Sequence, residues 1–369
     1  MVLREVVQAI GKKRCAIVGT TGVAAFNVGG ETIHLYLGLP TSPDQKLQEL
    51  GTSKLRDLQE KLTGIDYIFC DEMSMLSQET LAWVDIRLQQ IKGRPVPFGG
   101  VSLILVGDFA QLPPPKAVPL FAKDAKPDNV DAIHGQHLFS LFETCIILTE
   151  QMRAKQDAAW SEMLGRLKDC KMETADIELV QSRFIGKASN EKDKKFATAI
   201  RLFPTNLEVD DHNALTQCQR EVPIAEIRAE HSCDAARQTV NDVAGKLDGT
   251  LWLSVGANIM LTKNLWTAVG LTNGARGTVV DIIYAPGTSP PVLPLVILCH
   301  FPRYIGPSFE TARPRIVAVA PFTSEWGRNR EFSRTQFPLR LCDAMTIHKA
   351  QGDTLDAAVV HIGTKSEFA

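Results

Sequence analysis

The chain has 369 residues, more than one hydrophobic core usually organises, so we expect two compact domains. Hydrophobic residues make up 44% and charged residues 22% of the sequence, a balance that excludes disordered and fibrous proteins. The formal net charge of −2 excludes a general basic excess, so any contact with nucleic acid must come from a local surface.

Neither the cysteines nor the N-terminal residues indicate a secreted or membrane protein. The eight cysteines are scattered, with no CxxC pair and no spacing to histidine that suits zinc, which predicts reduced and mostly buried thiols. Residues 1–15 place a short apolar run before positive charges, the reverse of a secretory signal, and no stretch approaches a membrane span. The basic runs at 11–14 and 192–195 fit either nuclear signals or ordinary surface charge. We therefore expect an intracellular protein without membrane contact, in the nucleus rather than the mitochondrion.

Four short apolar runs in the N-terminal part predict buried parallel strands, at 15–18, 67–70, 102–108 and 145–149. A helix is predicted for 77–92, which begins at Ser77 as an N-cap and carries apolar residues on one face, namely Leu81, Val84, Leu88 and Ile91. Residues 35–60 are more than a plain crossover needs and predict a small inserted element. Strand, helix and strand in this order predict a parallel α/β layer within residues 1–150.

A second α/β series follows within residues 151–369. A helical stretch at 157–169 precedes predicted strands near 199–204, 338–347 and 357–362. Between roughly 250 and 337 the composition changes to Gly, Pro, Val and Thr, which is typical of short strands joined by turns. We therefore predict a second α/β domain that carries a small β-barrel insertion near residues 265–335.

The strand predicted at 67–70 ends in adjacent carboxylates, Asp71 and Glu72, within the sequence IDYIFCDEMSM. A nucleotide-hydrolysing site needs one carboxylate to hold the water shell of Mg²⁺ and a second to orient the attacking water. The carboxyl end of a parallel strand presents both at a crevice. In this Walker B interpretation Asp71 holds the metal through water and Glu72 orients the attacking water. The alternative is a strand that ends in acidic turn residues.

The strand predicted at 102–108 ends in Gly107 and Asp108, and Gln111 follows before a run of prolines. A glutamine in this place can hydrogen-bond a γ-phosphate and respond to its loss, which is how hydrolysis becomes movement. The alternative is that Gln111 only caps a turn. The two strand ends together are much more specific for a nucleotide site than either one alone.

These motifs resemble those of the PIF (petite integration frequency) family of superfamily 1 DNA helicases, relatives of the bacterial RecD helicases. The resemblance covers nearly the whole chain, and the motifs occur in the family's order. They are GTTGVAAFNVGGETIH at 19–34, DEMSM at 71–75, GDFAQLPP at 107–114, LTEQMRA at 148–154, LFPTN at 202–206 with VGANIMLTKN and GLTNGARG within 255–277, and TIHKAQGDTLD at 346–356, here called the late motif.

The resemblance implies two RecA-like motor domains with parallel sheets, of the P-loop NTPase fold, and an SH3-like insertion in the second. It implies an ATP-dependent DNA helicase that couples hydrolysis of ATP, with Mg²⁺, to 5′-to-3′ movement and duplex unwinding. The implied partners are single-stranded DNA and single/double-strand junctions. Family analogy points to DNA repair, recombination, replication through difficult structures and telomere maintenance.

The resemblance also assigns nucleotide contacts. Arg153 would approach the γ-phosphate as an arginine finger, an element worth roughly 10³ to 10⁵ in rate. The alternative is a surface arginine paired with Glu150. The remaining nucleotide-side residues are Gly107 and Asp108 in the first domain and Gln351 and Gly352 in the late motif.

The implied DNA contacts come from both domains. Hydroxyl, amide and imidazole groups near the N-terminus would bond DNA phosphates without reading bases, and the alternative is ordinary turn chemistry in a Gly-rich loop. A lone histidine is ordinarily a satisfied core residue, but the late motif around it favours DNA contact. The implied DNA-binding residues are Thr21, Asn27, His34, Lys263, Asn264, His348 and Lys349.

The sequence departs from the family pattern in two places. It contains no GxxxxGK[ST] loop, because Gly11-Lys12 is followed by Lys13 and Lys365-Ser366 lacks the glycines. The family's final motif, with a second phosphate-contacting arginine, is also absent. The first motor domain is thus expected to be incomplete and the second to lack its last motif. One hypothesis is a truncated helicase gene or gene model whose chain alone hydrolyses ATP poorly or not at all. The other is a non-catalytic single-stranded-DNA-binding protein derived from a helicase.

Overall fold

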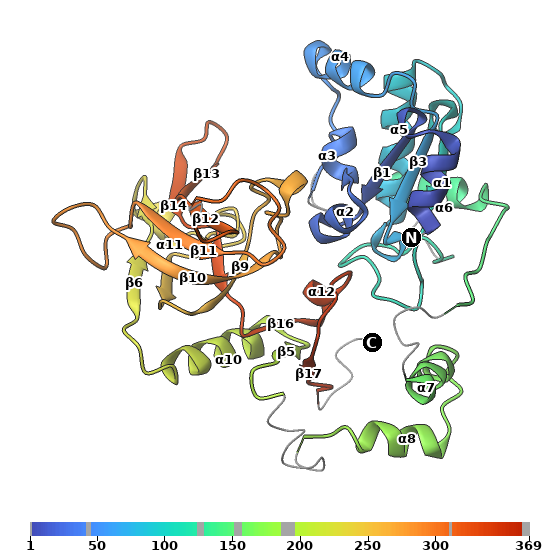
Figure 1. The fold of residues 1–369 in the computed structure, drawn as a ribbon. Helices are drawn as coiled ribbons and strands as arrows, with labels where there is room; N and C mark the ends of the chain where they lie inside the picture. The colour runs from blue at the N-terminus through green and yellow to red at the C-terminus, as the bar shows by residue number, and fades with distance from the viewer. Residues whose placement is uncertain are drawn as a thin grey trace.

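The structure is a computed structural model that describes residues 2–41, 46–123, 129–150, 157–185, 196–309 and 312–363. Figure 1 shows an α/β domain formed by the N-terminal part of the chain, a region of β-strands beside it, and a smaller sheet below the two. We call these the first domain (residues 2–141), the β region (residues 225–341) and the second sheet. The parallel sheets with helices in their crossovers confirm the predicted α/β class.

A four-stranded parallel sheet forms the centre of the first domain, in the order β2-β1-β3-β4. The strands are β1 (Cys15–Gly19), β2 (Glu31–Thr32), β3 (Tyr67–Asp71) and β4 (Ser102–Leu105). The strands predicted at 15–18 and 67–70 are confirmed, and the one predicted at 102–108 is confirmed over a shorter length. The register places Gly19 beside Asp71 and Cys70 beside Leu105, so these strands end at one edge of the sheet.

The predicted helix at 77–92 is confirmed as α5 (Gln78–Lys92). The Ser77 hydroxyl oxygen accepts a hydrogen bond from the Thr80 amide at 3.1 Å, and the predicted apolar face is buried in the core of the first domain. The other helices of this domain are α1 (Val2–Ile10), α2 (Gly22–Val28), α3 (Ile33–Leu37), α4 (Thr52–Lys61) and α6 (Val130–Ser140), with 3-10 turns η1 (Lys12–Arg14), η2 (Met73–Met75) and η3 (Pro97–Gly100). Residues 35–60 contain the end of α3 and nearly all of α4, and their description as an inserted element stays a prediction.

The apolar run at 145–149 does not form a strand, so this sequence prediction is wrong. Ile146, Ile147 and Leu148 are 83%, 80% and 70% exposed. A parallel strand exists only where a neighbour exchanges hydrogen bonds with it. Among the described residues β4 is the last strand of its sheet, and nothing pairs with its outer edge. The run therefore has strand-like composition but no partner strand in the part of the chain that the structure describes.

The second sheet has three parallel strands in the order β16-β5-β17. They are β5 (Ile200–Phe203), β16 (Ala344–Thr346) and β17 (Ala358–Val360), which confirms the strands predicted near 199–204 and 357–362. The single strand predicted near 338–347 is instead two strands, β15 (Leu339–Leu341) in the β region and β16 in this sheet, because the chain passes from one sheet to the other between them. The helix predicted at 157–169 is α7 (Ala158–Lys168). It is followed by α8 (Thr174–Gln181), and α10 (Asn206–Cys218) packs on β5 and β16. The short α12 (Ile347–Ala350) follows β16 directly and carries the late motif.

The β region consists of antiparallel strands. One sheet has the order β12-β11-β10-β9-β15, another has the order β13-β14-β7, and β6 pairs with β8. The five-stranded sheet and the β6-β8 pair share one apolar core. The strands are β6 (Ala225–Arg228), β7 (Glu230–His231), β8 (Thr250–Leu253), β9 (Asn258–Leu261), β10 (Arg276–Ile283), β11 (Val296–His300), β12 (Ile316–Val319), β13 (Phe322–Trp326), β14 (Phe332–Gln336) and β15 (Leu339–Leu341), with α11 (Asp234–Gln238) and η4 (Thr267–Val269) between them. Strands thus lie within 265–335 and on both sides of it, and the SH3-like barrel stays a prediction.

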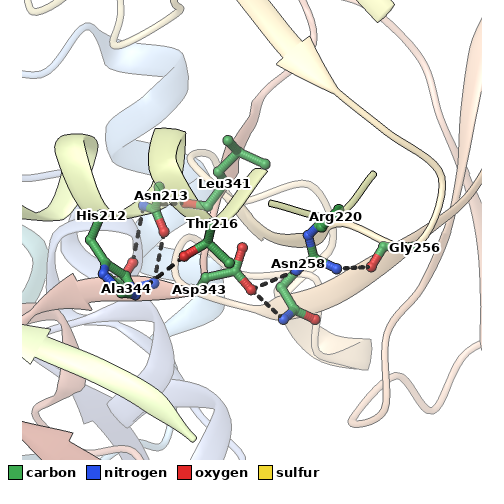
Figure 2. A network of polar contacts seen from close by, with 9 residues as sticks. All are labelled: His212, Asn213, Thr216, Arg220, Gly256, Asn258, Leu341, Asp343 and Ala344. Atoms are coloured by element: carbon green, nitrogen blue, oxygen red, sulfur yellow. Dashed lines mark hydrogen bonds and ion pairs between the residues drawn. The ribbon is translucent and has the colours of Figure 1, made fainter. Parts of the chain in front are cut away.

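A polar network fastens the second sheet to the β region (Figure 2). The Asp343 carboxylate accepts hydrogen bonds from Arg220 at 2.6 Å and from Asn258 of β9 at 2.7 Å. The Asn213 side chain of α10 donates to the carbonyls of Leu341 and Ala344 and accepts from the Ala344 amide at 2.7 Å. The chain that leaves β15 and enters β16 is therefore held in place just before the late motif.

All eight cysteines are free thiols, as predicted. The expectation that most are buried is wrong for half of them, since Cys15, Cys70, Cys299 and Cys342 are buried and the others are exposed. Burial raises the pKa of both Cys70 and Cys342 to about 12. None of the helices that the structure describes combines the length and hydrophobicity of a membrane-spanning segment.

Candidate nucleotide and DNA sites

The predicted Walker B residues lie at the end of β3. The Thr20 amide donates to the Asp71 carbonyl at 3.3 Å, and the Thr20 hydroxyl donates to the Glu72 carbonyl at 3.2 Å. Glu72 has φ 59° and ψ 49°, the left-handed region, which costs an ordinary residue roughly 1–2 kcal/mol. Such conformations cluster at functional sites because the surrounding contacts must maintain them. The chain thus turns sharply at the second carboxylate instead of continuing the strand.

Gly107 brings the end of β4 against the turn after β3. A Cβ atom at Gly107 would lie 2.8 Å from the Met73 nitrogen, and the φ of 153° is rarely adopted by residues with side chains. The Met73 amide also donates to the Val106 carbonyl at 2.9 Å. The ends of β3 and β4, which the sequence predicts to form one nucleotide site, are therefore in direct contact.

Asp108 and Gln111 form a turn beyond β4. The Gln111 amide donates to the Asp108 carbonyl at 3.0 Å, and the Gln111 side chain is exposed. The Asp108 carboxylate accepts from the Ala110 amide at 3.0 Å and pairs with Lys168 of α7 at 3.0 Å. Burial acts to raise the pKa of Asp108, but these two donors outweigh it, and the pKa lies below its ordinary value. Asp108 thus stays ionised and connects the first domain to α7.

The late motif reaches the Walker B carboxylate from the second sheet. The side-chain nitrogen of Gln351, Nε2, donates to Glu72 Oε2 at 3.3 Å and to Ser74 Oγ at 3.2 Å. The Gly352 carbonyl accepts from the Asn27 side-chain amide at 2.6 Å. Both predicted nucleotide-side residues of the late motif are therefore adjacent to the first domain, one of them at the Walker B glutamate.

The N-terminal residues predicted to bind DNA make contacts within the protein. The Thr21 hydroxyl accepts from the Ala24 amide at 3.1 Å and caps α2, which is the turn chemistry of the alternative interpretation. The Asn27 amide is bonded to Gly352. His34 is partly buried in α3, and burial lowers the pKa of its imidazole. None of these contacts tests the DNA role, which stays a prediction.

The predicted DNA residues of the β region lie close to the start of α2. The Asn264 Oδ1 atom accepts from the Asn273 amide at 2.8 Å, and a Cβ atom at Gly22 would lie 2.9 Å from it. Asn264 is therefore next to the start of α2 in space. Lys263 lies 4.8 Å from the centre of the Phe322 ring, so its charged end rests on the β13 strand.

Cations converge near the late motif. Desolvation and the charge of Lys246 lower the pKa of Lys263. Desolvation lowers the pKa of Lys349 as well, with the like charges of Arg340 and Lys246 adding to the effect. Lys349 still presents an exposed side chain, and His348 precedes it in α12. Arg340 also pairs with Asp210 at 3.9 Å and with Asp248 at 3.7 Å, so carboxylates offset part of this positive charge, and contact of this surface with phosphate groups stays a prediction.

Several residues of these sites were missed by sequence analysis. Thr20 contacts Glu72, and Ser74 contacts Gln351, the residue that binds Glu72. Both lie inside motifs that the sequence analysis quotes, so their position in those motifs could have identified them. Lys168, which pairs with Asp108, has no motif around it and no signal in the sequence. Arg153 lies outside the residues that the structure describes, so its predicted role stays a prediction.

The carboxylates at the end of β3 fit a magnesium ion that is held mainly by water and substrate. No group of three or more His, Cys, Asp and Glu side chains that could hold a metal occurs in the described ranges. Mg²⁺ in nucleotide sites commonly takes one or two carboxylates, several waters and the phosphates. The Asp71 carboxylate would serve such an ion through its water shell, which leaves Glu72 for the attacking water.

Comparison with protein families and curated proteins agrees with this geometry. The family model described as PIF1-like helicase matches residues 1–176, and the model described as DNA helicase Pif1, 2B domain, matches residues 242–282. The ATP-dependent DNA helicase PIF1 of Danio rerio is 29% identical over 366 residues, which cover 98% of this chain and 52% of that protein. The ATP-dependent DNA helicase Pif1 of Bdellovibrio bacteriovorus is 25% identical over 362 residues, covering 96% of this chain and 73% of that protein. The chain spans about half the length of the vertebrate relatives it matches.

Solved structures show the same fold. The Pif1 helicase of Candida albicans superimposes with a TM-score of 0.70 at 23% identity, over 97% of this chain and 81% of that one. A Bacteroides Pif1 bound to single-stranded DNA gives a TM-score of 0.68 at 22% identity, over 98% of this chain and 79% of that one. Family models of PIF1-like helicases match residues 1–176 and 242–282, the curated relatives cover 96–98% of the chain, and the chain belongs to the PIF1-like helicase family.

Proposed function

We propose that this chain is the motor core of an ATP-dependent DNA helicase that moves 5′ to 3′ on single-stranded DNA and unwinds duplexes. The observation that carries the proposal is the hydrogen bond between Gln351 of the late motif and Glu72 at the end of β3. It joins residues 279 positions apart at the edge where parallel strands end, which is where open α/β sheets bind ligands. A motor that closes on a nucleotide needs such a contact between its two halves, because closure must sense the reacting phosphate.

ATP and Mg²⁺ are the proposed substrate and cofactor. Asp71 would hold the metal through its water shell, and Glu72 would orient the attacking water. Gln111 and Arg153 would contact the γ-phosphate, with Arg153 as the arginine finger. When bound, Mg²⁺ supplies charge neutralisation on the phosphates. Gly107 supports this assignment because its missing side chain lets the end of β4 approach the Met73 backbone, beside the turn that carries the two carboxylates.

Single-stranded DNA, with its junction to duplex, is the proposed partner, and its path would follow the surface between α2 and the β region. The proximity of Asn264 to the start of α2 and the exposed side chain of Lys349 in the late motif support this path. The Asn27 side-chain amide has two hydrogens, so it would keep its bond with the Gly352 carbonyl and donate the second hydrogen to a phosphate. DNA as substrate implies an intracellular protein, with the nucleus favoured over the mitochondrion.

The sequence has no GxxxxGK[ST] loop, so we propose that this chain by itself hydrolyses ATP weakly or not at all. Without the loop, no backbone amides cradle the phosphates and no lysine neutralises them. Within the described ranges the outer edge of β4 has no partner strand, and this edge and the exposed apolar run at 146–148 support a further parallel strand at this side of the sheet. A phosphate-loop strand in that place would end beside Gly107.

Two assays test the proposal. Binding of fluorescent oligothymidine to the 369-residue chain should weaken with salt, and Lys349→Ala should reduce the slope of log affinity against log salt by about 0.7 for each phosphate that the variant no longer neutralises. The matched control is Lys171→Ala, an exposed lysine near α8. In a chain extended upstream by a strand and a GxxxxGK[ST] loop, DNA-stimulated ATP hydrolysis should appear, and Glu72→Gln should lower its rate about 10²- to 10⁴-fold.

The second candidate function is a non-catalytic single-stranded-DNA-binding protein, and the position of Asn264 next to the start of α2, away from the contact between Gln351 and Glu72, supports it. If the affinity of the extended chain for oligothymidine is the same with and without ATP, the non-catalytic DNA-binding function is supported. If the affinity changes with ATP, the helicase function is supported. Robust DNA-stimulated hydrolysis by the 369-residue chain alone would contradict the proposed need for the loop. Absence of any DNA binding would contradict both functions.

A further inference from the structure

Three consecutive residues of the late motif contact two other parts of the molecule, the first domain and the β region. Gln351 contacts Glu72 and Ser74 of the first domain, and the Gly352 carbonyl accepts from Asn27 of the same domain. The next residue, Asp353, turns to the β region. The segment is also anchored in its own sheet, because it follows β16 and α12 directly. Figure 1 shows α12 in the middle of the molecule, at the junction of these parts.

Two arginines of the β region hold the Asp353 carboxylate. Arg303 Nη1 lies 2.7 Å from Oδ1 and Arg276 Nη2 lies 3.2 Å from Oδ2. Arg303 also donates to the Thr354 carbonyl at 3.0 Å, so it binds the turn as well as the charge. The Asp353 side chain is only 9% exposed. A carboxylate so shielded, with a cation on each oxygen, is held more firmly than an exposed ion pair.

The same face of the β region also contacts the first domain directly. A Cβ atom at Gly270 would lie 2.9 Å from the Arg303 carbonyl and 3.0 Å from the Phe26 ring of α2. The arginine that holds Asp353 is therefore close to the helix that carries Asn27. Movement of the β region relative to α2 would change the position of Arg303, and with it the turn at 351–354.

We propose that Asp353 is a positioning residue through which the β region sets the approach of Gln351 and Gly352 to Glu72 and Asn27. The inference rests on the proposed function in one respect, that the Glu72 site is the nucleotide site. In this arrangement Arg276 and Arg303 act on the hydrolytic site through Asp353 without touching nucleotide or DNA. A bound DNA strand that shifts the β region would thereby alter the contact between Gln351 and Glu72.

The test measures amide hydrogen exchange by mass spectrometry on the 369-residue chain without ATP or DNA. Asp353→Asn keeps the size of the side chain and removes its charge, so the turn at 351–354 should loosen. Exchange should become roughly three- to tenfold faster at residues 20–28 and 71–75, with β10 and β11 within about twofold of the original chain. Arg303→Gln, a change made in the β region, should speed exchange at the same two segments.

Two variants separate positioning from general loss of stability. Asp353→Glu keeps the carboxylate and should restore slow exchange at 20–28 and 71–75, and Asp356→Asn, an exposed residue of the same motif, should change nothing. Unchanged exchange at both segments in Asp353→Asn and Arg303→Gln would overturn the proposal. An equal rise in exchange throughout the β region and the first domain would also overturn it. Failure of the helicase function would be seen separately, in the oligothymidine assay, and mimics neither outcome.

Discussion

The first domain and the second sheet are both parallel α/β structures, but they are held together differently. The first domain has a large apolar core of its own, built from its sheet and the helices around it. The second sheet shares a small buried cluster with the β region, since Met260 of β9 packs with Ile200, Leu202 and Met345. Its position depends further on the polar network around Asp343 and Asn213 (Figure 2). Asp71 and Glu72 thus belong to a domain with its own core, and the late motif, whose Gln351 contacts Glu72, belongs to a sheet that depends on the β region.

The largest expected effect is in the core of the first domain. Ile68 of β3 is completely buried, and Ile68→Ala should lower the free energy of unfolding by about 2–5 kcal/mol because it leaves a cavity beside the strand. The control, Leu35→Ala, removes a side chain of α3 that is 61% exposed and should cost less than about 0.5 kcal/mol. Urea unfolding followed by circular dichroism measures both. Equal costs for the two variants would contradict the description of this domain as a self-sufficient core.

The next largest effect comes from the second sheet, where a variant removes polar contacts and not apolar packing. Asn213→Ala removes the partner of the Leu341 and Ala344 backbone groups and should cost about 1–3 kcal/mol, the penalty of leaving buried groups unsatisfied. Amide exchange should speed up in β5 and β16 and stay unchanged in β1 and β3. Leu215→Ala, on the exposed side of the same helix, is the control. Faster exchange in β1 would show that the two sheets are one cooperative unit.

The same contrast explains what the sequence could predict. β1, β3 and β5 were predicted because strands buried on both faces have continuous apolar runs, and the α5 face because burial on one side gives apolar residues at helical spacing. The run at 145–149 has that pattern too, but whether it forms a strand depends on a partner that no local pattern encodes. The ion pairs of Asp353 with Arg276 and Arg303 could not be predicted from the sequence, for a related reason. Its two arginines are 77 and 50 positions away in the chain, and neither sits in a patterned context that points to an aspartate.

The helices that connect the two regions offer a pH-dependent test. Arg166 of α7 holds the Asp176 carboxylate of α8 by two hydrogen bonds, at 2.8 and 2.6 Å, and lowers its pKa from 3.8 to about 2. The folded-state pKa lies below the unfolded value, so the stabilisation is fully present above about pH 4 and is lost as the pH falls through about 2. The melting-temperature gap between the original chain and Asp176→Asn should therefore close over this range. Asp169→Asn, an exposed control, should show no such gap at any pH.

The smallest expected effect tests whether α7 is docked on the first domain. Lys168 of α7 pairs with Asp108 of the first domain at 3.0 Å, with side chains 53% and 38% exposed. An ion pair so exposed contributes about 0.2–1 kcal/mol, and salt should weaken it. A double-mutant cycle with Lys168→Ala and Asp108→Asn should give a coupling free energy in that range at low salt, and the pKa of Asp108 should rise towards its ordinary value in Lys168→Ala. Lys171→Ala is the matched control, because Lys171 pairs with Asp169 and not with the first domain. A coupling free energy of zero would mean that α7 is not docked on the first domain in solution, and the domain with its own core would then end at α6.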